Sequence, residues 1–176
     1  KDVELLRQYL NIERWTLFGQ SFGGFCAVHY LSAYPQSLER VLITGGLPPI
    51  SGHADRVYRH TYRRLQTRNE RFFKRYPSDQ QQLNKIRDHL QRAPVRTGNG
   101  SILSVQRFQQ LGLRIGMSDG RETLHYLLEG AFTQTPRGEE LSEHFLHDVE
   151  QKLPFARNPI YALLHESIYC QEEASN

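Results

Sequence analysis

The chain has few cysteines and no long apolar run, and both absences limit what it can be. Only Cys26 and Cys170 occur among 176 residues, which is too few for the disulfide framework of a small secreted domain. We therefore expect a reducing, cytoplasmic setting. No stretch approaches the roughly 18 consecutive apolar residues of a membrane-spanning helix, so we expect no membrane partner.

Strand-like sequence is nearly absent after residue 45. Before it, residues 15–18 and 41–44 form short apolar runs typical of buried parallel strands. Residues 2–10 are typical of an amphipathic helix, because Val3, Leu6 and Leu10 recur at helical spacing. From residue 51 onward we find only polar segments with helical spacing. The sequence therefore predicts an α/β part over residues 1–50 and an all-helical domain over residues 51–176.

A serine stands at the turn between the first predicted strand and a helical stretch. Residues 19–23 read GQSFG, the G-x-S-x-G pattern of a nucleophile elbow, in which a sharp turn exposes the serine hydroxyl. We expect Gly19 and Gly23 at positions where side chains would collide with the strand and the helix. Phe22 would be the first residue of the helix. Its N–H would supply one donor of an oxyanion hole for a nucleophilic Ser21.

The five-residue pattern by itself also fits a structural glycine turn. The context favours a nucleophile, because Pro35 ends the helix and the strand at 41–44 then completes a β-α-β unit. A dinucleotide-binding loop is disfavoured, since Ser21 replaces the second glycine of G-x-G-x-x-G. Thr44 and Gly45 also end the next strand, where such a loop calls for an acidic residue.

Capping residues and apolar spacing predict the helices of the second domain. The expected helices cover residues 56–76, 78–90, 105–111, 119–131, 139–152 and 158–168. The first is expected to bury one stripe of apolar side chains, namely Tyr58, Tyr62, Leu65, Phe72 and Tyr76. In the helix at 139–152, the residues expected to point inward are Leu141, Phe145 and Val149.

Two clusters in these helices have a functional and a structural interpretation. Residues 56–76 carry eight Lys or Arg residues, which could form a nucleic-acid surface. Because the aromatics share one face, a solvated helix is favoured and no nucleic-acid partner is expected. His144 and His147 stand beside Asp148 without a third-ligand pattern, so no metal and no other cofactor are expected.

Glu166 stands out in the last predicted helix. Its neighbours on the helical wheel are Ala162, Tyr169 and Cys170. A carboxylate in such surroundings is costly to bury unless it meets a charge partner, and a substrate ammonium group would be one. An exposed glutamate at the edge of the apolar face is the alternative interpretation.

Four segments together resemble the larger-type prolyl aminopeptidases (proline iminopeptidases), which are α/β hydrolases with a helical cap. They read GQSFGGFC at 19–26, LITGGLPP at 42–49, GMSDG at 116–120 and NPIYALLHESIYC at 158–170. The resemblance implies a serine peptidase that releases N-terminal proline from peptides through an acyl-enzyme on Ser21. It implies a cap inserted after the strand that follows the elbow. The smaller prolyl aminopeptidases are similar in having a cap glutamate followed three residues later by a tyrosine, as Glu166 and Tyr169 stand here, which implies that Glu166 and Tyr169 bind the substrate at its terminal nitrogen.

Parts of that family's pattern have no match in this chain. Neither the HGGP-like oxyanion loop nor the triad aspartate and histidine on later strands is found. Asp148 with His165, or Asp119 with His125, would be substitutes in the right order, but they fall in predicted helices. Because a two-stranded parallel sheet has open edges and faces, we expect an internal segment of an α/β hydrolase that is inactive alone.

Two further function classes stay open. An esterase or epoxide-type hydrolase would share Ser21 without needing Glu166. A non-catalytic helical interaction module would keep the fold without a reactive serine. The sequence does not indicate an oligomeric state.

Overall fold

The computed structural model describes residues 1–153, 155 and 158–175. The chain forms two compact units. Residues 1–54 and 165–176 make up the N-terminal unit, and residues 55–164 make up the helical unit. The sequence predicted one division near residue 50, whereas the structure assigns the last residues to the N-terminal unit. The reason is a β-bridge between Gly52 and Gln171, in which the Gln171 N–H donates to the Gly52 carbonyl at 3.0 Å.

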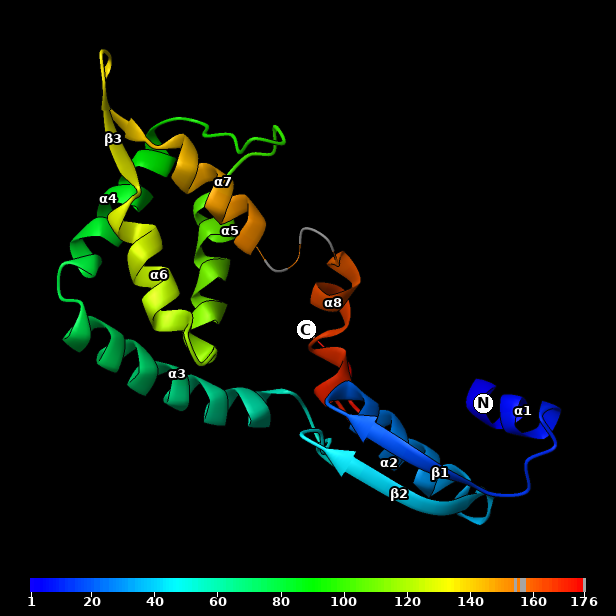
Figure 1. The fold of residues 1–176 in the computed structure, drawn as a ribbon. Coiled ribbons are helices and arrows are strands. Elements are labelled where there is room, and N and C mark those ends of the chain that lie inside the picture. Colours follow the sequence, from blue (N-terminus) through cyan, green and yellow to red (C-terminus); the bar gives the residue numbers. More distant parts are fainter. Residues whose placement is uncertain (154, 156–157, 176) are drawn as a thin grey trace. The chain divides into compact units, whose positions relative to one another are not determined.

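The N-terminal unit contains a two-stranded parallel sheet whose two strands are connected along the chain by a helix (Figure 1). Its elements are α1 (Asp2–Tyr9), β1 (Trp15–Gln20), α2 (Phe22–Ala33), the 3₁₀ turn η1 (Pro35–Ser37), β2 (Leu38–Thr44) and the 3₁₀ turn η3 (Ser167–Tyr169). In the register, Leu17 pairs with Val41 and Gly19 pairs with Ile43. The predicted order of helix, strand, helix and parallel strand is confirmed.

Helix α1 turns a different face inward from the one its apolar spacing predicts. Val3, Leu6 and Leu10 are exposed, while Glu4 is buried. The Glu4 carboxylate is held there because the Tyr30 hydroxyl of α2 and the Ser37 hydroxyl of η1 donate to it. A buried carboxylate is tolerated when hydrogen bonds replace its water.

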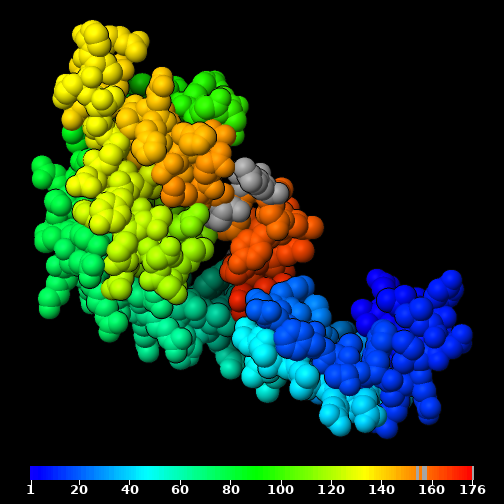
Figure 2. All heavy atoms as spheres, in the orientation of Figure 1, coloured from blue at the N-terminus to red at the C-terminus, as the bar shows by residue number. Residues whose placement is uncertain are grey.

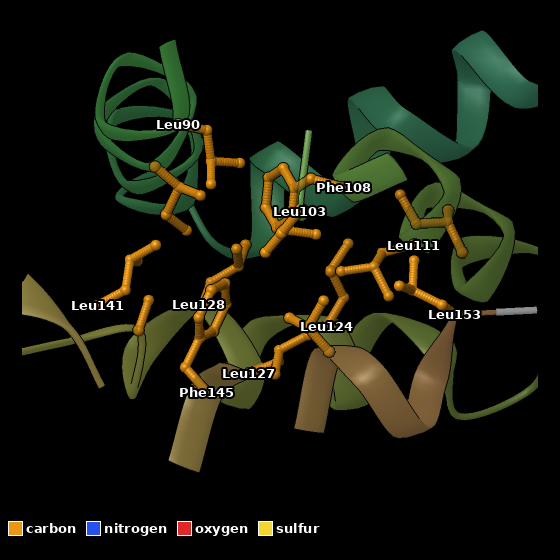
Figure 3. Packing of buried hydrophobic residues seen from close by; sticks show 14 of the residues in the cluster. Leu90, Leu103, Phe108, Leu111, Leu124, Leu127, Leu128, Leu141, Phe145 and Leu153 are labelled. Carbon is orange, nitrogen blue, oxygen red and sulfur yellow. The ribbon is translucent and has the colours of Figure 1, made fainter. Parts of the chain in front are cut away.

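All helices of the helical unit except the last contribute to one hydrophobic core (Figure 1). Its elements are α3 (Asp55–Arg75), α4 (Asp79–Arg92), α5 (Val105–Gln109), the 3₁₀ segment η2 (Gln110–Gly116), α6 (Gly120–Glu129), β3 (Phe132–Thr135), β4 (Gly138–Leu141), α7 (Glu143–Lys152) and α8 (Pro159–Leu164). Helices α3 to α7 contribute to the core, whereas α8 has no buried residue. Figure 3 shows leucine and phenylalanine side chains from several of these elements meeting in that core. The predicted inward residues Phe145 and Val149 are fully buried.

A β-hairpin contradicts the prediction of an all-helical second domain. Strands β3 and β4 pair antiparallel, with Phe132 opposite Leu141, and the hairpin forms the projecting tip drawn in yellow in Figure 2. Gly138 has a φ of +115° after the turn, a conformation that favours glycine. The helix expected from residue 139 begins instead at Glu143, because the Ser142 side chain accepts the Phe145 N–H at 3.0 Å as its cap. Strands of four residues are too short to show a clear alternating pattern.

The stripe expected along α3 is buried only near the end of that helix. Phe72 is fully buried and Tyr76, just after α3, is half-buried, whereas Tyr62 is 65% exposed and Leu65 is 39% exposed. The prediction of one buried stripe, interrupted only at Asn69, is therefore wrong for its middle part. The helix expected over 158–168 is also interrupted, since α8 ends at Leu164 and η3 lies in the other unit.

Candidate functional site

Ser21 occupies a strained turn between β1 and α2. Its φ is +54° and its ψ is −122°, a backbone region that residues with a side chain rarely adopt. Two hydrogen bonds hold it there. The Ser21 N–H donates to the Thr44 carbonyl at the end of β2, at 3.0 Å, and the Ser21 carbonyl accepts the Gly24 N–H at 2.9 Å. The turn leaves the serine residue exposed, as a nucleophile elbow requires.

Two glycines make this turn sterically possible. One is Gly19, as the pattern predicts, but the other is Gly24 and not the predicted Gly23. A Cβ on Gly19 would lie 2.3 Å from the Gly23 carbonyl oxygen, which agrees with the predicted collision. A Cβ on Gly23 would meet no atom of the described residues within 4 Å, so the collision predicted there is absent. It occurs one residue later, because a Cβ on Gly24 would lie 2.0 Å from the carbonyl oxygen of Gly46.

Phe22 is the first residue of α2. The first N–H groups of a helix have no acceptor within that helix, and they lie at its positive end. The Phe22 N–H belongs to the same peptide group as the Ser21 carbonyl. A negatively charged oxygen beside Ser21 would therefore meet a donor and a favourable dipole together.

The C-terminal segment joins the elbow in the N-terminal unit. The Tyr169 ring packs edge-on against the ring of Phe25 in α2, with centroids 5.6 Å apart and an interplanar angle of 83°. Glu166 is half-buried and precedes η3, where its carbonyl accepts the Tyr169 N–H at 2.9 Å. Ser21, Phe22, Glu166 and Tyr169 thus all belong to one compact unit, although more than 140 residues separate the two pairs along the chain.

His125, considered as the histidine of a substitute triad with Asp119, lies beside another carboxylate. His125 Nδ1 lies 3.0 Å from Asp79 Oδ2, and its ring stacks on Tyr76 with centroids 3.8 Å apart. This cluster links α4, α6 and the residue after α3, which is a structural role. Sequence spacing suggested Asp119 as the partner of His125, and nothing in the sequence pointed to Asp79.

Asp148 is held by a neighbour in its own helix. Lys152 Nζ donates to Asp148 Oδ2 at 2.6 Å, and this bond lowers the pKa of the Asp148 carboxyl below its usual value. Asp148 lies in the helical unit, whereas His165, its suggested partner, belongs to the N-terminal unit.

A buried polar cluster beside the sheet was not found by sequence reasoning. Glu4 accepts hydrogen bonds from Arg7, from Gln8 at 3.2 Å, from the Tyr30 hydroxyl and from the Ser37 hydroxyl at 3.3 Å. The hydrogen bond from Arg7, followed by that from Tyr30, lowers the pKa of the Glu4 carboxyl to about 2. The spacing of Glu4 and Arg7 could have indicated their ion pair, but their contact with Tyr30 could not be read from it.

Part of the cationic cluster on α3 contacts the rest of the helical unit. Arg68 Nη1 donates to the Ile115 carbonyl at 2.9 Å, and Arg75 lies 3.4 Å from Glu122, so two cations of α3 bind their own unit. No group of three or more His, Cys, Asp or Glu side chains suited to a metal ion occurs in the described part of the chain. Within the same residues, every helix is too short or too polar to cross a membrane.

Known proteins resemble this chain along its whole length. A proline iminopeptidase of Aeromonas sobria is 48% identical over 177 aligned residues, which cover 100% of this chain and 41% of the relative. A proline iminopeptidase of Aspergillus aculeatus is 32% identical, covering 99% of this chain and 40% of the relative. The resemblance to prolyl aminopeptidases is confirmed, and the chain spans less than half the length of these two relatives.

The match to a protein family includes the elbow. The family model described as alpha/beta hydrolase fold matches residues 1–131, which contain β1, Ser21, α2 and β2 in the observed strand, turn, helix and strand order. The strained Ser21 and the parallel pairing of β1 with β2 fit that fold. Because the model covers most of the chain, the chain belongs to the α/β hydrolase fold family.

Proposed function

We propose that Ser21 is the nucleophile of a serine peptidase that releases N-terminal proline from peptides, in a whole protein of which this chain forms part. The observation that carries the proposal is the strained backbone of Ser21 at the end of a strand and the start of a helix. The names of the two relatives support the substrate class.

The reaction would proceed through an acyl-enzyme. The Ser21 oxygen attacks the carbonyl carbon of the N-terminal residue while its proton passes to a histidine outside these 176 residues. The Phe22 N–H stabilises the oxyanion that forms. The peptide C–N bond then breaks, the leaving amine takes the proton from the histidine, and water hydrolyses the serine ester to free proline.

Glu166 would recognise the charged end of the substrate. The ring nitrogen of an N-terminal proline carries two N–H donors and a positive charge, which a half-buried carboxylate can bind through a charge-assisted hydrogen bond. Tyr169, whose ring packs on Phe25 of the elbow helix, would form a wall of the same pocket. An apolar wall with one carboxylate selects a small cationic end group.

The helical unit would act as a cap over this site. It is inserted between β2 and residues 165–176, both of which belong to the N-terminal unit. A cap would limit access to short N-terminal segments. Since the triad histidine and aspartate would come from outside this chain, residues 1–176 alone are expected to be inactive. The two free thiols, Cys26 and Cys170, fit a cytoplasmic protein.

The test compares Ser21→Ala with wild type in the whole protein. Loss of fluorophosphonate labelling and a fall of more than about a hundredfold in kcat on a proline arylamide are expected, since triad serines carry the covalent step. Ser32→Ala, at an exposed serine of α2, is the matched control and should label like wild type. Hydrolysis of simple esters but not of proline arylamides would indicate an esterase. Failure of the wild-type protein to label would indicate a non-catalytic module.

A further inference from the structure

Gly46 lies directly against the backbone of Ser21. A Cβ on Gly46 would be 1.8 Å from the Ser21 carbonyl oxygen, 2.6 Å from its carbonyl carbon and 2.9 Å from its Cα. All three are main-chain atoms, so no side chain could rotate away to make room. The preceding Gly45 is different, because its φ is +61° and a Cβ there would meet none of the described atoms within 4 Å.

The contact is reciprocal across the elbow. A Cβ on Gly24 would lie only 2.0 Å from the Gly46 carbonyl oxygen. Gly24 in turn donates its N–H to the Ser21 carbonyl at 2.9 Å. The segment after β2 and the first turn of α2 therefore approach each other through two facing glycines, with the Ser21 carbonyl between them.

We propose that Gly46 is a positioning residue for the reaction at Ser21, an inference that depends on the proposed function. The carbonyl that Gly46 contacts belongs to the peptide group linking Ser21 to Phe22. That group is planar, and its N–H points away from its C=O. A displacement of the Ser21 oxygen must therefore redirect the Phe22 N–H, which is the proposed oxyanion donor. The Ser21 Cα, which carries the nucleophile, would itself lie 2.9 Å from a Cβ on Gly46.

A methyl group at position 46 would push residue 46 and the Ser21 carbonyl apart. Non-bonded Cβ contacts shorter than 3.0 Å essentially never occur, so the Ser21 carbonyl or residue 46 must shift by about 1 Å. A misplacement of that size in a catalytic group can lower the rate on the order of a hundredfold. The three atoms nearest to a Cβ on Gly46 all belong to Ser21 and none to Glu166, so recognition of the substrate's charged end should change little.

The experiment compares Gly46→Ala, Gly24→Ala and Gly112→Ala in the whole protein. The first two introduce the close contacts described above. Gly112→Ala is the matched control, because a Cβ there meets none of the described atoms within 4 Å. For each variant, kcat and KM on a proline arylamide, the rate of fluorophosphonate labelling and the thermal midpoint are measured.

We expect kcat and the labelling rate of Gly46→Ala to fall together, on the order of a hundredfold, while KM stays within about twofold and the variant remains folded. Gly24→Ala should show the same split. It tests the same approach of the two segments from the other side, and the thermal midpoint shows for each variant whether the protein is folded. Gly112→Ala should match wild type in all four measurements.

Two outcomes overturn the inference. One is folded Gly46→Ala or Gly24→Ala protein that labels at the wild-type rate. The other is a loss of activity that follows only the fraction of unfolded protein. If wild-type protein labels at Ser21 and either result occurs, the inference fails and the proposed function stands. If wild-type protein does not label, or Ser21→Ala keeps its activity, the proposed function itself fails.

Discussion

Tyr169 meets Phe25 edge-on, with ring centroids 5.6 Å apart. Phe25 stands four residues after Ser21 in α2, and Tyr169 belongs to the segment that returns to the N-terminal unit after the helical unit. This contact connects the residue pair proposed to recognise the substrate with the helix that begins at the elbow. It makes the position of Tyr169 dependent on α2.

Two substitutions of Tyr169 distinguish the contribution of its ring from that of its hydroxyl group. Tyr169→Ala should lower the free energy of unfolding, by about 0.5–1.5 kcal/mol for the ring pair beyond the effect of burial, and should raise KM for a proline arylamide. Tyr169→Phe keeps the ring pair and should retain wild-type stability. Urea unfolding and steady-state kinetics of the whole protein measure both effects. Tyr9→Ala, at a residue that is 82% exposed, is the control, and an equal loss in it would contradict the prediction.

Glu166→Gln tests the recognition of the substrate ammonium group. We expect kcat/KM for proline arylamides to fall by roughly ten- to a hundredfold, because a charge-assisted hydrogen bond contributes about 1.5–3 kcal/mol. Hydrolysis of an uncharged ester should hardly change. Glu173→Gln, at an exposed residue of the same segment, should behave like wild type. Equal losses on both substrates would indicate a folding role for Glu166 instead.

Glu4 should make stability depend on pH in the acid range. Its folded pKa is about 2, below the ordinary value of 4.5, so its contribution is fully present above pH 4.5 and is lost as the pH falls toward 2. Urea midpoints of wild type and Glu4→Gln should therefore differ most above pH 5 and converge as the pH approaches 2. In the control variant Glu129→Gln, which alters an exposed side chain, the midpoint should follow that of wild type at every pH. A constant difference between wild type and Glu4→Gln would contradict the assignment.

Asp79 should contribute more to the free energy of unfolding than an exposed aspartate in an ion pair does. It is 3% exposed and lies 3.0 Å from His125 Nδ1. Asp79→Ala leaves a half-buried imidazole without this partner, which costs about 1–3 kcal/mol. Asp88→Ala, in the same helix, removes the exposed ion pair with Arg87 and should cost less than about 1 kcal/mol. Urea unfolding of both variants tests the prediction, and equal costs would show that the Asp79 contact is unimportant.

The sequence alone was sufficient to locate the elbow, because the residues that mark it are consecutive. The apolar run before Ser21, the glycines around it and the helix-forming residues after it act on one short stretch of backbone. The same holds for most helices of the helical unit, whose apolar residues recur with the helical period. These features depend on local conformation and on which face of an element is buried.

Contacts between distant segments were decided only by the tertiary structure. The pairing of Asp79 with His125, the burial of Glu4 by Tyr30, and the return of residues 165–176 to the N-terminal unit join side chains that no periodic pattern relates. The hairpin of β3 and β4 escaped prediction because its strands are too short to show alternation. Gly46 is the clearest case, since a glycine two residues beyond Thr44, the last residue of β2, resembles any loop glycine. Its importance follows only from the approach of Ser21, because steric exclusion depends on which atoms the fold brings together.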